Sequence, residues 1–449
     1  MASPAASIPA SKPGDLACAA RLAAPWRDPV EALEPFADEP YAALLHGSGG
    51  WSYLLRRPHA VEVVEPGSTR ESLPALLGPL TPVMVESPPF QGGVVGLAAY
   101  ELSARLEASA PDIRDPAWPD LILARYPALL AFHDGERRVL AIGRGPTEAE
   151  AERLAREALA WLREATSAPR PNGPLAERID APASHAAAVA ETIERIAAGV
   201  IFQANLARSW RGILAAGRTP FDLFRRLSQA SPAPYAAYLR LPGAAVVSNS
   251  PERFLSVRGA EVETRPIKGT RPRGADPASD AANAADLLAS GKDRAENLMI
   301  VDLMRNDLSR VCAPGSVTVP ELAALKSYAN VHHLVSRVRG RLAGGRTAWD
   351  AFLAAFPPGS ITGAPKLQAM KVIADYEAPR GPYCGSLFWA GLDGALDASV
   401  LIRTVALVEA AGGWRFEARA GGGIVADSDP AAEVAETDTK ISAILGALA

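Results

Sequence analysis

Short apolar or alternating runs, bounded by glycine and proline, recur along the chain. Alternation with a period of two places successive side chains on opposite faces, so these runs predict β-strands. The strands cluster instead of alternating regularly with helices, which favours an α+β fold with antiparallel sheets over a parallel doubly wound fold. The predicted strands are residues 61–64, 121–124, 139–142, 235–241, 244–249, 253–257 and 260–264, with more between 383 and 420.

Apolar residues at helical spacing, preceded by capping residues, predict the helices. Thr147 is a candidate N-cap, and Asp429 followed by Pro430 is a strong signal for the start of a final helix. We expect helices to dominate residues 281–376. The other predicted helices are residues 147–166, 184–198, one that begins at Thr219 and Pro220, and 430–448.

The organisation along the chain follows from its proline content. Residues 1–25 are small, proline-rich and weakly charged, which predicts a disordered tail. Residues 167–183 are also proline-rich and lack periodicity, which predicts a linker. The sequence therefore predicts an N-terminal region at 26–166 and a C-terminal region at 184–449.

Composition narrows the possible functions. Of the 449 residues 48% are hydrophobic, and 46 basic against 50 acidic residues give a net charge of −4. This balance offers no basic excess for a nucleic acid or an anionic membrane. No uninterrupted apolar run of about 18 residues predicts a transmembrane helix, and the N-terminus does not resemble a signal peptide. Three widely separated cysteines suit a reducing compartment, so we expect a cytoplasmic protein.

Two acidic pairs are candidate metal ligands. Glu433, Glu436 and Lys440 stand at i, i+3 and i+7 of the final helix and share one face. Asp293 and Glu296 form a second i, i+3 pair at the start of another predicted helix. Each pair alone is compatible with a solvated, salt-bridged face or a favourable helix dipole. Together they could supply hard oxygen ligands for Mg²⁺.

Two glycine-containing segments could bind anions. Gly421, Gly422 and Gly423 expose backbone N–H groups without side chains, which suits a carboxylate or phosphate, although a tight turn explains them equally well. Residues 358–366 (PGSITGAPK) place glycines, a hydroxyl group and a lysine before a helix. Neither segment has the spacing of a dinucleotide fingerprint or a nucleotide P-loop.

Four further side chains are candidates for chemistry. Lys268, in RPIKGTRPR, is the only lysine between residues 13 and 291 of a chain that prefers arginine. Lysine can act as an amine nucleophile and arginine cannot, although a surface cation in a turn is the alternative. Glu252, in SNSPERF, could be a general acid or an ion-pair partner. His332 and His333 precede a predicted helix, and without a GxSxG motif no hydrolase triad forms around them.

Taken in order, these segments resemble the chorismate-utilising enzymes. The resemblance covers residues 190–445 and nine segments, and the N-terminal region is similar to the family's less distinctive first region through residues 51–55 and 92–101. The matching segments are IFQANLAR (201–208), SPERF (250–254), RPIKGTRPRG (265–274), DRAENLMIVDLMRNDL (293–308), HHLVSRV (332–338), FPPGSITGAPK (356–366), RGPYCG (380–385), IRT (402–404) and AGGGIVADSDPAAEVAETDTK (420–440).

The resemblance implies an α/β sandwich of stacked antiparallel sheets flanked by helices, with chorismate and Mg²⁺ in one active site of the C-terminal region. Glu296 and Glu436 would hold Mg²⁺, with Asp293 and Glu433 beside them, and the metal would bind the ring carboxylate of chorismate. The residues implied to bind the enolpyruvyl carboxylate are Tyr383, Arg403, Gly421, Gly422 and Gly423, and those implied to line the pocket are Thr270, His333, Thr362 and Lys440.

Two positions distinguish activities within the family. The members that add water place a lysine base where this chain has Gln203, so the resemblance implies ammonia as the nucleophile. A lysine at the position of Lys268 is typical of members that aminate chorismate at C4 on the route to p-aminobenzoate and folate, and it would attack C2 while Glu252 protonates the leaving hydroxyl. The alternative is the anthranilate-forming activity of tryptophan biosynthesis. With no fused glutaminase segment, a separate glutamine amidotransferase is the expected ammonia source.

Overall fold

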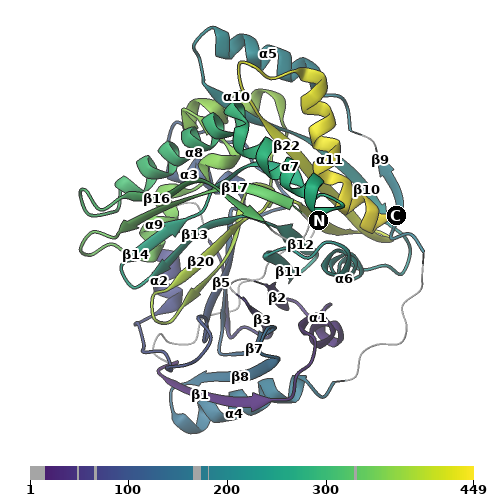
Figure 1. The fold of residues 1–449 in the computed structure, drawn as a ribbon. Helices are drawn as coiled ribbons and strands as arrows, with labels where there is room; N and C mark the ends of the chain where they lie inside the picture. Colours follow the sequence, from purple (N-terminus) through teal and green to yellow (C-terminus); the bar gives the residue numbers. More distant parts are fainter. Residues whose placement is uncertain (1–15, 48–49, 65–67, 165–172, 181, 328–330) are drawn as a thin grey trace.

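Two antiparallel β-sheets stacked face to face, with helices on both outer faces, make up the protein (Figure 1). The computed structural model describes residues 16–47, 50–64, 68–164, 173–180, 182–327 and 331–449. Every strand pairing in these ranges is antiparallel. The predicted α+β sandwich is confirmed.

The larger sheet contains 12 strands among the described residues. Its N-terminal and C-terminal strands join where β2 pairs with β11. In spatial order they are β1 (Cys18–Ala24), β8 (Arg138–Gly145), β7 (Ala128–His133), β3 (Trp51–Leu55), β2 (Ala43–His46), β11 (Tyr235–Leu241), β12 (Ala244–Ser250), β21 (Thr404–Ala410), β22 (Gly413–Ile424), β10 (Gln203–Leu214) and β18 (Gly363–Ala364), with β9 (Ala176–Asp180) also paired to β10.

The second sheet contains 10 strands in the same described ranges. It too combines both parts of the chain, because β19 pairs with β5. Its strands are β15 (Ile267–Pro272), β17 (Val331–Arg341), β14 (Glu261–Thr264), β13 (Arg253–Arg258), β20 (Leu396–Val400), β19 (Ser386–Gly391), β5 (Gly93–Ala98), β6 (Leu121–Tyr126) and β4 (Ala60–Val63), with β16 (Thr318–Ser327) also paired to β17.

The core has three large apolar layers and a smaller cluster where two helices pack on β10. On β5, Val95 and Leu97 join the layer between the two sheets, whereas Val94 and Ala98 join the layer under the helices. The third layer packs helices against the outer face of the larger sheet. Because both faces of the central strands are buried, these strands read as nearly continuous apolar runs in the sequence.

The helices begin where the sequence places capping residues. Thr147 accepts from the Glu150 N–H, Thr219 and Asp222 form a capping box, and Asp429 accepts from the Ala432 N–H. The helices are α1 (Pro29–Leu33), α2 (Thr69–Leu77), α3 (Ser103–Leu106), α4 (Glu148–Trp161), α5 (Ala186–Ala197), α6 (Pro220–Ala230), α7 (Pro277–Ala289), α8 (Gly291–Ser309), α9 (Ala348–Ala355), α10 (Lys366–Tyr376) and α11 (Pro430–Leu448), with 3-10 turns η1 (Glu34–Phe36), η3 (Tyr100–Leu102) and η4 (Gly359–Ile361).

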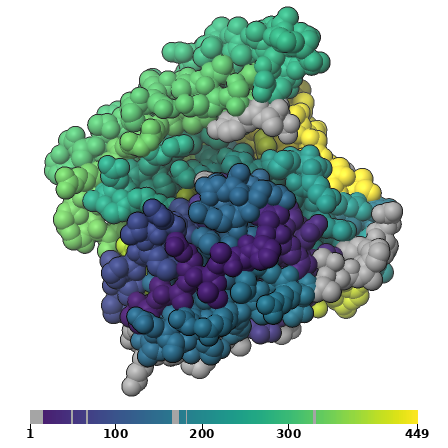
Figure 2. Space-filling model, turned by 60° about the horizontal axis from the view of Figure 1, so that its bottom comes forward, coloured from purple at the N-terminus to yellow at the C-terminus, as the bar shows by residue number. Residues whose placement is uncertain are grey.

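The predicted tail and linker are partly ordered. Cys18–Ala24 forms β1, which pairs along its length with β8, and Ala176–Asp180 forms β9 at the end of β10. Backbone pairing with an existing strand edge orders both segments although neither has a strong apolar pattern. Residues 1–15, 167–172 and 181 of these two predictions lie outside the described residues. In Figure 2 the N-terminal residues, in purple and blue, pack closely beneath the C-terminal residues in green.

The expectation that helices dominate residues 281–376 is wrong over Thr318–Ser327 and Val331–Arg341, which form the hairpin strands β16 and β17. His332 and His333 therefore lie inside a strand and do not precede a helix. Burial on both faces hides the alternation of β17, where residues 332–336 are all buried. No helix in the described part of the chain is long and apolar enough to cross a membrane.

Candidate active site

Lys268 lies at the centre of the candidate site, on β15. A register shift at Gly269, whose φ is +76°, separates Lys268 from Thr270 along the strand pair with β17. The Lys268 ammonium lies 3.7 Å from Glu296 Oε2 on α8, and each of these two side chains is only 14% exposed. Lys268 is therefore a largely enclosed amine in a strand and is not a surface cation in a turn.

Glu252 immediately precedes β13 and is 6% exposed. The Ser360 hydroxyl donates a 2.8 Å hydrogen bond to its Oε1 atom. Burial raises the pKa of Glu252 to about 7, although the Ser360 hydrogen bond and the charges of Lys268 and Lys440 favour the ionised form. A carboxyl group with this pKa can carry a proton at neutral pH, as a general acid requires.

The acidic face of α11 is oriented by neighbouring groups. Glu433 Oε1 accepts a 2.7 Å hydrogen bond from Ser428 Oγ, whereas its buried Oε2 has no hydrogen-bond partner among the described residues. Burial, followed by repulsion from Glu436, raises the pKa of Glu433. Lys440 lies 2.6 Å from Glu436 Oε1, and although burial opposes ionisation, the neighbouring lysines lower the pKa of Glu436. This face of α11 is therefore polar, and only some of its carboxylate oxygens have hydrogen-bond or ion-pair partners among the described residues.

The first turn of α8 approaches α11. Lys292 Nζ lies 3.9 Å from Glu433 Oε1, so the two helices bring their acidic pairs to the same region. Asp293 points elsewhere, because it pairs with Arg271 at 3.4 Å. The predicted carboxylates therefore divide into Glu296, Glu433 and Glu436 around the lysines, with Asp293 at the side.

These carboxylates fit a magnesium ion that substrate and water help to coordinate. Among the described residues, no three Asp, Glu, His or Cys side chains gather closely enough to hold a metal by themselves. Mg²⁺ usually takes one or two protein carboxylates and completes its shell with water and ligand oxygens. The unpartnered Oε2 of Glu433 is a hard oxygen that a cation would satisfy.

Residues 421–423 lie inside β22 and not in a turn or loop. A Cβ atom on Gly422 would come within 2.6 Å of Glu433 Oε2, and one on Gly423 would come within 3.2 Å of Lys268 Nζ. The absence of side chains lets the carboxylate and the amine approach the strand closely. These glycines therefore make room for the site's charged groups.

Gln203, the first residue of β10, faces the same space. It is fully buried, and neither its amide nitrogen nor its amide oxygen has a hydrogen-bond partner in the described part of the chain. A Cβ atom on Gly423 would lie 2.0 Å from Gln203 Nε2. A buried, unsatisfied amide is costly unless a ligand pairs with it, and a neutral amide cannot serve as a base.

Thr270 and His333, predicted to line the pocket, lie near Arg403, which is predicted to bind a carboxylate. Thr270 Oγ1 and His333 Nδ1 lie 2.9 Å apart, and burial, with the charge of Arg403 as a lesser cause, lowers the pKa of His333. The Arg403 guanidinium forms no hydrogen bond or ion pair with any described side chain, and burial lowers its pKa. An enclosed guanidinium without a carboxylate is suited to an anionic ligand.

The loop before α10 contributes differently from the prediction. Thr362 is fully buried and donates to the Pro358 carbonyl oxygen at 3.1 Å. Lys366 donates to Asp307 Oδ2 at 2.7 Å and to the Ala355 carbonyl at 3.0 Å, so its charge is already paired. The lysine of residues 358–366, the segment predicted to suit anion binding, therefore fastens α10 to α8.

Tyr383 and Arg403 are brought near each other by their backbones. The Cys384 N–H donates to the Leu401 carbonyl at 2.8 Å, and the Leu401 N–H donates to the Gly385 carbonyl at 2.9 Å. Tyr383 is 6% exposed, and the Arg380 guanidinium lies 5.7 Å from its ring centroid. The segment that carries Tyr383 is therefore firmly held beside the segment that leads to Arg403.

Comparisons with known proteins identify the family. A family profile described as chorismate binding enzyme matches residues 48–446. Aminodeoxychorismate synthase component 1 of Klebsiella aerogenes is 37% identical, with 95% of this chain and 98% of that protein covered. The chain belongs to the chorismate-binding enzyme family.

Other members of the chorismate-binding enzyme family match over most of the chain. Aminodeoxychorismate synthase component 1 of Escherichia coli K12 is 39% identical, covering 82% of this chain and 79% of that protein. Anthranilate synthase component 1 of Thermus thermophilus is 41% identical, with 80% of this chain and 78% of that protein covered. The solved structure of anthranilate synthase component I from Streptococcus pneumoniae has a TM-score of 0.71 at 26% identity. It covers 95% of this chain and 92% of that chain. The predicted family and fold are confirmed.

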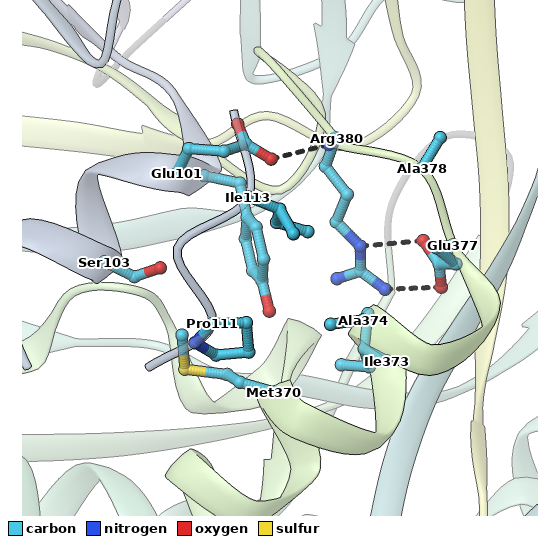
Figure 3. Close-up of a pocket in the computed structure, with 11 residues that line it drawn as sticks. Glu101, Ser103, Pro111, Ile113, Met370, Ile373, Ala374, Glu377, Ala378 and Arg380 are labelled. Atoms are coloured by element: carbon cyan, nitrogen blue, oxygen red, sulfur yellow. Dashed lines mark hydrogen bonds and ion pairs between the residues drawn. The ribbon is translucent and has the colours of Figure 1, made fainter. Parts of the chain in front are cut away.

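Several residues of this family member were missed by sequence reasoning. Ser360 and Ser428 orient Glu252 and Glu433, which lie 108 and 5 residues away in the sequence, but a serine carries no signal that predicts which carboxylate it will contact. Figure 3 shows a pocket between η3 and α10 that is lined by Glu101 and Arg380 among others, and none of the predicted site residues lies in it.

Proposed function

We propose that this protein is the chorismate-aminating component of aminodeoxychorismate synthase, which converts chorismate and ammonia to 4-amino-4-deoxychorismate on the route to p-aminobenzoate and folate. The observation that carries the proposal is the enclosed amine of Lys268, which lies among Glu296, Glu252 and Gly423. In the resemblance to the family, a lysine at this position is typical of this activity.

The proposed reaction uses Lys268 as a covalent nucleophile. Its neutral amine attacks C2 of chorismate, the two conjugated ring double bonds shift towards C4, and the C4–O bond breaks as Glu252 protonates the hydroxyl, which leaves as water. Ammonia then adds at C4 and the Lys268 amine departs from C2. Splitting one difficult displacement into two easier steps is the general advantage of covalent catalysis. The raised pKa of Glu252, about 7, supports its role as the proton donor.

Substrate binding is assigned to the remaining groups. Arg403, which has no ion-pair partner among the described residues, and Tyr383 would bind the enolpyruvyl carboxylate with the backbone of residues 421–423. Thr270, with His333 behind it, would line the pocket next to Lys268. Charge-assisted hydrogen bonds from a guanidinium to a carboxylate are among the strongest available in such a site.

Glu296 and Glu436 would hold Mg²⁺, with Glu433 and Asp293 beside them. When bound, Mg²⁺ would neutralise the ring carboxylate of chorismate and fix its orientation. Glu433 supports this assignment through the buried carboxylate oxygen that lacks a donor in the described structure. The cationic side chains that face Glu296, Glu433 and Glu436 are Lys268, Lys292 and Lys440.

Ammonia is the proposed nucleophile because of Gln203. Members of the family that add water resemble one another in having a lysine base at this position, and the amide of Gln203 cannot remove a proton from water. Its unsatisfied amide oxygen could accept a hydrogen bond from ammonia. We infer that a separate glutamine amidotransferase supplies the ammonia, consistent with the name component 1 of the relatives.

Anthranilate synthase component I is the alternative, because relatives with that name also match most of the chain. It would release pyruvate and form an aromatic product, whereas the proposed enzyme would retain the enolpyruvyl group. Incubation with chorismate, MgCl₂ and ammonium chloride, followed by mass spectrometry of the products, tests the choice. Aminodeoxychorismate supports the proposal, and anthranilate with pyruvate would overturn it.

A further inference from the structure

A buried group of side chains next to the substrate pocket, here called the Arg380 brace, consists of Glu101, Glu377, Arg380 and Arg419. The Arg380 guanidinium forms two parallel hydrogen bonds with Glu377, from Nε at 2.9 Å and from Nη2 at 2.8 Å. The side chains of Arg380 and Glu377 are 1% and 6% exposed. Because the paired charges are excluded from water, their geometry is tightly fixed.

Arg380 also joins two separate backbone segments of the site. Its Nη1 donates to the Ile361 carbonyl at 3.1 Å, and its Nη2 donates to the Asn205 carbonyl at 2.7 Å. Ile361 immediately precedes Thr362. Asn205 pairs across the sheet with Gly423, and its N–H donates to the Thr362 carbonyl at 2.8 Å. One guanidinium therefore fixes the Thr362 loop relative to the glycine strand.

The segment that carries Tyr383 is held by the same brace. The Glu101 carboxylate accepts from the backbone N–H groups of Arg380 at 2.6 Å and Gly381 at 3.0 Å, as the dashed line from Glu101 in Figure 3 illustrates for Arg380. The guanidinium lies 4.8 Å from the ring centroid of Tyr100 and 5.7 Å from that of Tyr383. Glu101 therefore fixes the start of this segment, and the Arg380 guanidinium lies against the Tyr383 ring.

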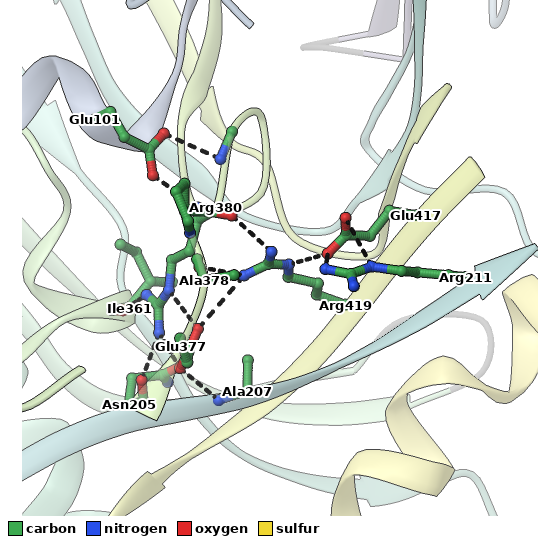
Figure 4. A network of polar contacts seen from close by, with 12 residues as sticks. Glu101, Asn205, Ala207, Arg211, Ile361, Glu377, Ala378, Arg380, Glu417 and Arg419 are labelled. Carbon is green, nitrogen blue, oxygen red and sulfur yellow. Dashed lines mark hydrogen bonds and ion pairs between the residues drawn. The ribbon is translucent and has the colours of Figure 1, made fainter. Parts of the chain in front are cut away.

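Glu377 ties the brace to the glycine strand a second time. Its Oε1 accepts a 2.8 Å hydrogen bond from the Ala207 N–H, and Ala207 pairs with Gly421. Arg419 lies 3.7 Å from Glu377 Oε2 and donates to the carbonyls of residues 378 and 379 (Figure 4). The charged members of the brace thus have partners, and none of the contacts is with the predicted reacting groups.

We propose that Arg380 is a positioning residue for chorismate, which sets the relative places of the segments that carry Thr362, Tyr383 and residues 421–423. This inference rests on the proposed function, because those three segments were assigned there to substrate binding. Arg380 acts through them and has no contact of its own with the substrate. Lys268 and Glu296, on β15 and α8, make none of the brace contacts and should remain competent when it is weakened.

Arg380→Lys is the test substitution. Lysine keeps the positive charge opposite Glu377, but its compact ammonium cannot replace the planar fork that reaches the carboxylate and both carbonyls. We expect the KM for chorismate, and the Kd measured by calorimetry, to rise about tenfold or more, as for other supporting residues of binding groups. The KM for ammonium should stay unchanged, and kcat should fall much less than the KM rises.

Arg211→Lys is the matched control, because Arg211 belongs to the same polar network in Figure 4 but, within the described part of the chain, its guanidinium pairs only with Glu417, at 3.3 Å. Arg211→Lys should leave the KM and the Kd for chorismate unchanged. Glu101→Gln provides a second test if Arg380→Lys does not fold, since it preserves shape but can accept only one of the two backbone N–H groups. It should raise the KM for chorismate in the same selective way.

The outcomes separate this proposal from the proposed function. If wild-type protein forms no aminated product, the proposed function fails, and the calorimetric Kd for chorismate still tests the brace. If the folded brace variants bind chorismate as the wild type does, or lose kcat with an unchanged KM, the positioning role is wrong. A similar rise in KM for Arg211→Lys would also overturn it, because the effect would not be specific to the brace.

Discussion

Replacing Glu252 with Gln should abolish most activity while making the protein more stable above neutral pH. Burial raises the pKa of Glu252 from 4.5 to about 7, so the folded protein holds this proton more tightly than the unfolded chain does. Gln is neutral, has the same shape, and can still accept the hydrogen bond from Ser360. The substitution therefore removes the ionisable proton without removing the packing.

The size of the effect on stability follows from the two pKa values. A difference between 4.5 and about 7 corresponds to about 3 kcal/mol of differential free energy. Above about pH 7 the carboxyl group is ionised in both states, and the folded state carries the full penalty of a buried charge. The penalty shrinks as the pH falls from 7 to 4.5, because the folded state then keeps its proton. Below 4.5 both states are protonated and no penalty remains.

Urea unfolding of wild type and Glu252→Gln at about pH 8 and about pH 5.5 measures this difference. We expect Glu252→Gln to be more stable by up to about 3 kcal/mol at the higher pH and by clearly less at the lower pH. Its turnover of chorismate should fall by about 10²–10⁴-fold, the usual contribution of a general acid. Wild-type turnover per unit of free ammonia should decline about tenfold for each pH unit above 7.

Ser360→Ala provides a graded control. It removes a hydrogen bond to the ionised carboxylate, so it should raise the pKa of Glu252 further and move the declining limb of the activity profile to higher pH. The reasoning is refuted if Glu252→Gln turns over chorismate at the wild-type rate, or if its stability relative to wild type is the same at both pH values.

The remaining predictions concern the amine, the metal, the partner and a buried ion pair. Lys268→Arg should lose aminodeoxychorismate formation in a product assay while its free energy of unfolding changes by less than about 1 kcal/mol. EDTA should stop turnover and added Mg²⁺ should restore it, and Glu296→Gln or Glu436→Gln should each remove most activity without unfolding the protein by circular dichroism. The purified chain should use ammonium salts and not glutamine, which a comparison of the two nitrogen sources checks. Asp307→Asn should reduce the free energy of unfolding by roughly 3 kcal/mol in urea titrations, because it leaves the Lys366 charge buried without its partner.

Local signals predicted the frame of the fold. The capping residues Thr219 and Asp429 mark the starts of α6 and α11, and alternation marks the strands from residue 235 to 264. These features depend on neighbours within a few residues, which a sequence displays directly. The prediction of a disordered tail missed the strand Cys18–Ala24, because this strand is ordered by pairing with β8, more than a hundred residues away.

Candidate site residues could be predicted from the sequence where their type is uncommon among their neighbours. They could not be predicted where a contact between distant parts of the chain determines their surroundings. Lys268 stands out in an arginine-rich chain, and the role proposed for it is the one that the resemblance to the family implies. The sequence predicted a helix after His333, whereas His333 lies in a strand. Both faces of that strand are buried, so its sequence lacks the alternation that predicts a strand. The pairing of Glu101 with the backbone of Arg380 spans 279 residues, and only the tertiary structure brings them together.

The measurement that tests the account most directly is mass spectrometry of the protein quenched after mixing with chorismate and Mg²⁺ in the absence of ammonium. The account predicts a chorismate-derived adduct on the peptide that contains Lys268, which disappears as aminodeoxychorismate forms when ammonium is added. Formation of aminodeoxychorismate at the wild-type rate by Lys268→Arg, with no adduct on the wild-type peptide, would contradict it.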